Sequence, residues 1–308
     1  MNNANPVTHG FRAVLRDPVL FIVEVAWRWV FGLIAFALLY HAFHGLSQSV
    51  AIAQADAVAW RSRDVTALVA SALRIADESG GKIFSMAAFI LSAITLLWVF
   101  LGSIGRVITL KRLSHGDYQV RSLTIFMLQV LRAFSMWIGT LVLLSTITVE
   151  GQISTGGDTP NVFLYYLLVL PSVLIIGILW TMMNWYLSLA PACVCDPATG
   201  AFKAIRLARK LGRLRRAEFG SVSVLSVLLR LAGLMVVFVL CVATSGWMGP
   251  SPNAYAALVF GVSLAYFAFA DFLFAVRQAS FVEIVMRPDE QGTATLSGPM
   301  AGTDPAAG

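Results

Sequence analysis

The chain has 308 residues, of which 58% are hydrophobic and 12% are charged, and its formal net charge is +6. Soluble domains carry roughly twice that charged fraction, so this composition excludes an ordinary water-soluble domain. Forty residues without a charged side chain separate Arg230 from Asp271, whereas a bilayer-spanning helix needs only about 20 apolar residues. The sequence therefore predicts an all-α integral membrane protein with several spans.

Six apolar blocks are long enough to cross a bilayer, and their order predicts a polytopic bundle of three helical hairpins. We predict that residues 1–286 form this single transmembrane domain. Residues 287–308 are rich in Gly, Ala, Thr and Pro, which predicts a disordered cytoplasmic tail. The six predicted spans cover about residues 19–43, 83–104, 123–149, 161–183, 219–244 and 254–276.

Two further segments have the apolar spacing of interfacial amphipathic helices. The first covers about residues 64–79 on the outer side, where Asp64 is a candidate N-cap and Gly80-Gly81 a candidate stop. This helix could dock a partner, or it could pack on the bundle. The second covers about residues 197–216, with an apolar stripe at Phe202, Ile205, Ala208 and Leu211.

The second amphipathic segment carries seven cations, which predict contact with anionic phospholipid head groups. Nucleic acid is not a predicted partner, because the segment has no interleaved exposed aromatic residues and no binding fold. The predicted lipid contacts are Lys203, Arg206, Arg209, Lys210, Arg213, Arg215 and Arg216.

Loop charges predict the orientation of the spans. The loops after spans two and four are rich in Lys and Arg, whereas the loops after spans three and five carry none. Positive loops stay in the cytoplasm, so both termini are predicted to be cytoplasmic. Composition and topology together favour a multi-pass membrane protein.

The first helix of each hairpin carries one arginine, which indicates a weak threefold internal repeat. At helical rise these arginines lie about 24 Å from the outer boundary, in the inner part of the hydrocarbon. We predict a polar layer there, in which Glu24 pairs with Arg28 four residues on, and Asp271 pairs with Arg132 or Arg230. This layer either fixes the fold while its arginines reach lipid phosphates, or forms a pathway for a solute or a lipid head group.

Groups that could carry chemistry are scarce. His41 and His44 share a helix face, but no third histidine is placed to complete a haem or metal site. No zinc-protease motif, nucleophile elbow or phosphate-binding loop is present, and the predicted spans offer only Glu24 and Asp271 as carboxylates. We therefore predict no catalytic residues, no cofactor and no metal.

One stretch resembles a known family. Asn184-Trp-Tyr-Leu-Ser-Leu-Ala-Pro-Ala-Cys-Val-Cys-Asp196, followed by Ala201-Phe-Lys-Ala-Ile-Arg-Leu-Ala-Arg-Lys210, leads an apolar helix through an Ala-Pro segment and an acidic turn to a basic helix. In this it resembles bacterial membrane proteins of the glycerophosphodiester phosphodiesterase membrane-domain-like group. The turn of that family and the Ser-Trp of its basic helix are not matched. The resemblance implies a six-helix inner-membrane domain without catalytic residues of its own.

These observations predict a non-enzymatic inner-membrane protein that acts as a structural or accessory subunit, with the lipid bilayer and other membrane proteins as partners. The alternative is a transporter or lipid-handling protein that uses the polar layer. A discontinuous span would favour transport. The only candidate for such a break is Pro171 followed by Gly177 in the fourth span.

Overall fold

The fold was analysed in a computed structural model that describes residues 6–49, 61, 65–114, 120–156, 161–194, 199–245 and 252–287. Within these ranges all regular structure is helical, and six helices are long and apolar enough to cross a membrane. The predicted fold class is therefore confirmed. The predicted disordered tail lies outside the described residues, apart from Arg287.

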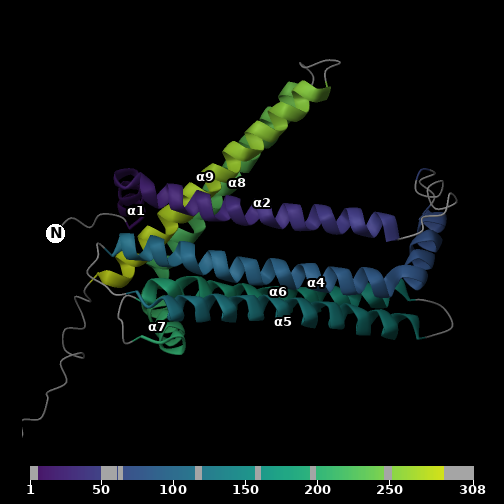
Figure 1. Ribbon diagram of the computed structural model, residues 1–308. Coiled ribbons are helices and arrows are strands. Elements are labelled where there is room, and N and C mark those ends of the chain that lie inside the picture. The colour runs from purple at the N-terminus through teal and green to yellow at the C-terminus, as the bar shows by residue number, and fades with distance from the viewer. Residues whose placement is uncertain are drawn as a thin grey trace, which may run out of the picture. The chain divides into compact units, whose positions relative to one another are not determined.

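The six long helices follow the six predicted spans (Figure 1). In hydrocarbon, water cannot satisfy backbone N–H and C=O groups, so an apolar segment buries these groups within its own helix. Large apolar side chains point outward from these helices, and Phe84 and Phe163 are 77% and 76% exposed. The long helices are α2 (Pro18–Ser49), α4 (Val65–Leu113), α5 (Ser122–Thr155), α6 (Val162–Leu189), α8 (Arg216–Ser245) and α9 (Pro252–Met286).

Three short elements accompany the long helices. They are α1 (Pro6–Arg16), the 3-10 turn η1 (Ala190–Cys193) and α7 (Ala201–Leu214). The helix α7 confirms the predicted basic helix and lies inside its predicted bounds. Its buried residues are Ala204, Ala208 and Gly212, whereas Phe202 is 76% exposed. Phe202 of the predicted stripe therefore faces away from the protein, and α7 packs through its smallest side chains.

The predicted outer helix is not a separate element. The helix α4 starts at Val65 and continues without a break to Leu113, so Gly80-Gly81 does not end a helix. A glycine inside a helix costs only about 1 kcal/mol relative to alanine. Ending a helix leaves four carbonyl groups without intrahelical partners. Continuing the helix into the apolar span avoids that loss.

Contacts within the chain divide it into two compact units. Unit 1 comprises Met1–Phe21, Arg112–Gln119 and Leu189–Gly308, and unit 2 comprises Ile22–Lys111 and Val120–Ser188. In unit 2, α2, α4, α5 and α6 run side by side, whereas unit 1 contains the α8–α9 hairpin (Figure 1). The loop charges predict which end of each unit is cytoplasmic. We call that end the inner end of the unit.

The inner end of unit 1 has a packed core like that of a small soluble domain. The helix α1 packs along the last turns of α9, where Val14 joins Val276 and Ala279 in a buried cluster. Phe281 is fully buried, and its ring centroid lies 5.5 Å from that of Phe219 in α8. Because α1 and the end of α9 pack together, both ends of the described chain lie on the same side of unit 1.

The contact between α1 and α9 depends on a glycine. A Cβ atom at Gly10 would lie 2.6 Å from the backbone oxygen of Val276 and would also collide with the side chain of Ser280. Backbone atoms cannot move aside as a flexible side chain can. The close approach therefore requires glycine at this position.

We expect Gly10→Ala to destabilise the protein by about 1–3 kcal/mol, because overpacking forces the helices apart. The measurement is thermal unfolding in mild detergent. Gly32→Ala is the matched control, because nothing lies within 4 Å of the added Cβ in α2. Equal melting temperatures for the two variants would contradict the close approach.

Candidate functional site

The most deeply buried carboxylate of the inner half of unit 2 is Glu24 in α2. It is 1% exposed, and it accepts hydrogen bonds from Trp27 Nε1 and from Arg28 Nη2, the latter at 3.5 Å. These residues are three and four positions further along the chain, so they share one helix face with Glu24. The predicted pair of Glu24 and Arg28 is confirmed. The participation of Trp27 was not predicted.

Trp27 also fixes the contact between α2 and α4. A Cβ atom at Gly105 would collide with the indole ring of Trp27, and one at Gly102 would lie 3.7 Å away. Only a glycine at position 105 therefore lets the indole approach α4 this closely. The same ring donates the hydrogen bond to Glu24, so helix packing and the orientation of the carboxylate depend on one side chain.

Arg132 in α5 joins three helices of unit 2. Its Nε donates to Asn184 Oδ1 of α6 at 3.1 Å. Its guanidinium carbon lies 5.7 Å from the ring centroid of Trp98 in α4, within the range of a cation–π contact.

The remaining residues of the predicted polar layer belong to unit 1. Arg230 in α8 donates from Nη2 to the carbonyl of Ala270 in α9 at 3.4 Å, and its guanidinium lies 5.9 Å from the ring centroid of Phe274. Asp271, the next residue after Ala270, is 7% exposed. Arg230 and Asp271 are therefore at similar levels of one hairpin. The predicted pairing of Asp271 with an arginine stays a prediction.

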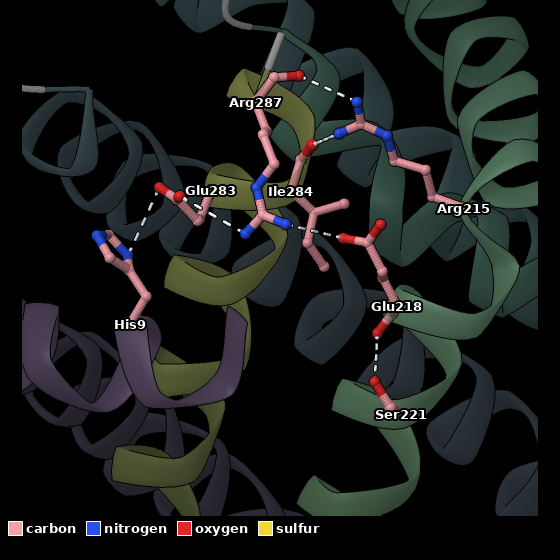
Figure 2. A network of polar contacts seen from close by, with 7 residues as sticks. All are labelled: His9, Arg215, Glu218, Ser221, Glu283, Ile284 and Arg287. Carbon is pink, nitrogen blue, oxygen red and sulfur yellow. Dashed lines mark hydrogen bonds and ion pairs between the residues drawn. The ribbon is translucent and has the colours of Figure 1, made fainter. Parts of the chain in front are cut away.

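Polar contacts between charged and titratable side chains connect three helices at the inner end of unit 1 (Figure 2). Arg287, just beyond α9, lies 3.5 Å from the carboxylate of Glu218 in α8 and 3.9 Å from that of Glu283 in α9. Glu283 in turn lies 3.6 Å from Nδ1 of His9 in α1. In each pair, at least one of the two side chains is about one-third exposed or more. Such exposed pairs individually contribute little to the free energy of unfolding. Together they fix which turns of α1, α8 and α9 face one another.

Arg215 caps the end of α9. It donates from Nη1 to the carbonyl of Ile284 and from Nη2 to that of Arg287 at 3.0 Å (Figure 2). Carbonyl groups at a helix C-terminus have no intrahelical partner, and a cation there is also favoured by the helix dipole. Arg215 therefore stabilises the fold and does not belong to the exposed cationic face of α7.

The helix α7 presents a cationic face on the side opposite its buried residues. At about 100° per residue, Arg206, Arg209 and Arg213 lie within about 40° of the exposed Phe202 around the helix axis. Lys203 and Lys210 border them, and all five cations are exposed. We call these five cations and Phe202 the α7 surface.

Sequence reasoning missed a polar contact near the other end of unit 2. Ser172 in α6 donates from Oγ to Glu150 Oε1 in α5 at 2.6 Å, and Glu150 is 8% exposed. Glu150 lies one residue beyond the predicted third span, so it resembled an ordinary loop carboxylate. Asn184 and Trp98 were also missed as partners of Arg132, because sequence spacing gives no information on contacts between helices.

In the described part of the chain, no group of three or more His, Cys, Asp or Glu side chains is placed to hold a metal ion. His44 instead contacts neighbours on its own helix, with Nε2 3.1 Å from Gln48 Nε2 and its ring stacked on Tyr40. No protein-family model, curated protein or solved structure matches the chain. The resemblance of residues 184–210 to the phosphodiesterase membrane-domain-like group stays a prediction.

Removing the carboxylate of Glu24 leaves Trp27 and Arg28 without their common acceptor. We expect Glu24→Ala to destabilise the protein by about 1–3 kcal/mol, the usual cost of an unsatisfied buried polar group. The measurement is thermal unfolding in mild detergent.

The chain offers a matched control for Glu24→Ala. Arg74 and Glu78 in α4 form a pair at the same helical separation, with atoms 2.9 Å apart, but the Glu78 side chain is 52% exposed. Glu78→Ala should change stability by less than about 1 kcal/mol. Equal effects of the two substitutions would contradict a special role for the buried carboxylate.

Proposed function

We propose that this chain is a non-enzymatic, multi-pass protein of the bacterial inner membrane that serves as a structural or accessory subunit. In this proposal both termini are cytoplasmic, and the α7 surface binds anionic phospholipid head groups. The observation that carries the proposal is the orientation of α7, which buries small residues and leaves five cations and a phenylalanine exposed.

The composition of the α7 surface suits a membrane surface. Each Lys or Arg near an anionic leaflet contributes about 1 kcal/mol of attraction, so five cations together give a substantial attraction. An aromatic side chain among them can enter the boundary between head groups and acyl chains. The helix is held to η1, which directly continues α6, so the spans keep α7 near the membrane.

The alternative, a transporter that works through the polar layer, has less support. A broken fourth span was the sequence feature that would favour transport. The helix α6 instead runs without interruption from Val162 to Leu189 with Pro171 inside it. The arginines of the layer contact tryptophan, asparagine and backbone groups, which favours a role in fixing the fold.

The proposal of a non-enzymatic role rests on the sequence, where the predicted spans offer only two carboxylates and no nucleophile motif. The resemblance to the phosphodiesterase membrane-domain-like group supports the same proposal, since it implies a membrane domain without catalytic residues.

The test uses Phe202→Cys in a chain whose three native cysteines have been replaced. A polarity-sensitive dye is then attached to the thiol at position 202. We expect the dye emission to shift to the blue in nanodiscs containing phosphatidylglycerol, relative to phosphatidylcholine alone. The shift should diminish at about 1 M salt, where the Debye length falls to about 3 Å.

Two sets of substitutions separate charge from structure. Replacing all five cations of the α7 surface by Gln should abolish the blue shift, because the attraction depends on charge. Replacing Arg206, Arg209 and Arg213 by Lys retains the charge and should preserve the shift. A shift of equal size in neutral nanodiscs, or one that survives the Gln substitutions, would refute anionic-lipid binding by α7.

A further inference from the structure

An open-sided cavity of about 390 Å³ lies among α2, α4 and α5 of unit 2. Its walls are mostly apolar, and its polar lining groups include Thr95, whose hydroxyl accepts a hydrogen bond from Trp137 Nε1 at 3.2 Å. We call this cavity the α2–α4–α5 groove. Its lining includes Phe31, Leu91, Ile94, Trp98, Met136 and Trp137.

The groove runs along the helices, away from the inner end. On α5 its lining extends from Ala133 to Thr140, seven residues or about 10 Å at helical rise. On α4 it extends over the same number of residues from Trp98 to Leu91, since α4 runs in the opposite direction. An apolar groove with this direction and length can take part of a lipid acyl chain.

The inner end of the groove is cationic. Arg132 directly precedes the lining residue Ala133, and its guanidinium lies over the ring of Trp98, which also lines the groove. Arg28, whose Nη2 lies 3.5 Å from the Glu24 carboxylate, already has an anionic partner. The cation at this end of the groove is therefore the guanidinium of Arg132.

A charge in hydrocarbon is costly unless a polar or charged partner stabilises it. By the spacing of the third span, Arg132 lies about 24 Å from the outer boundary, in the inner part of the hydrocarbon core. The long side chain of an arginine can extend toward phosphate groups at the inner boundary. The same position thus offers a cation for a head group and an apolar groove for its acyl chain.

We propose that the α2–α4–α5 groove binds one anionic phospholipid of the inner leaflet. Its head group is held by Arg132, and one acyl chain lies against Trp98, Met136 and Trp137. This site is distinct from the α7 surface, which belongs to unit 1 and attracts head groups without enclosing a chain. The groove site goes beyond the proposed function and does not rest on it.

The test uses native mass spectrometry of the detergent-purified full chain, titrated with phosphatidylglycerol or phosphatidylcholine. All variants carry the five Gln substitutions of the α7 surface, so that remaining lipid binding reports on the groove. We expect one phosphatidylglycerol to bind more tightly than phosphatidylcholine. Arg132→Gln should weaken phosphatidylglycerol roughly tenfold or more, because a charge-assisted hydrogen bond is lost.

A second variant tests the acyl-chain part without touching the arginines. Thr140→Phe fills the outer part of the groove and should weaken both lipids. Leu144→Phe, one helical turn further along α5 and outside the lining, is the matched control and should bind both lipids as the parent does. Thr140→Phe keeps the proposal testable even if Arg132→Gln fails to fold.

Three outcomes would overturn the groove site. The first is equal affinity of the parent for the two lipids, and the second is binding that Thr140→Phe leaves unchanged. The third is displacement of the lipid by millimolar inorganic phosphate, since that would indicate a site for phosphate alone. None of these outcomes bears on the dye measurement at position 202, so failure of one proposal is distinguishable from failure of the other.

Discussion

The absence of water from hydrocarbon is the constraint on which this structure depends. Backbone groups in such a solvent must be satisfied within the chain, so the apolar segments form long, continuous helices. The constraint is strong enough to carry α4 through Gly80-Gly81 and α6 through Pro171, two places where a soluble helix often ends. The same constraint governs charge, because an ion in a low-dielectric medium needs a partner or a route to the head groups. Glu24 and Arg28 meet that need by pairing with each other.

At the inner end of unit 1 the side chains pack as in the core of a soluble protein. Small residues let α1 approach α9 and let α7 pack through Ala204 and Ala208, while aromatic rings such as Phe281 fill the interior. The end of α9 is satisfied by a guanidinium instead of by water, since Arg215 donates to its terminal carbonyls. This packing gives the short basic helix a fixed face toward its surroundings, and the lipid-binding proposal depends on that fixed face.

Two cationic features of the chain suit two different parts of a lipid layer. The α7 surface is a broad array of exposed charges, which suits many head groups held loosely. The α2–α4–α5 groove places fewer charges beside an apolar channel, which suits one lipid held by both its head and its chain. Both features lie toward the inner ends of their units. An accessory protein that collects anionic lipid in the inner leaflet is consistent with both.

The sequence by itself determined the fold class, the six spans, the basic helix and the pairing of Glu24 with Arg28. All of these depend on local information, because periodicity, the length of an apolar block and spacing within one helix are set by neighbouring residues. Only the tertiary structure decided that Trp27 lies against Gly105, that Arg132 contacts Trp98 and Asn184, and that Arg215 caps α9. It also decided that α7 exposes Phe202 and buries its small residues. These contacts join residues up to 78 positions apart, and hydropathy cannot reveal them because lipid and a neighbouring helix are equally apolar surroundings.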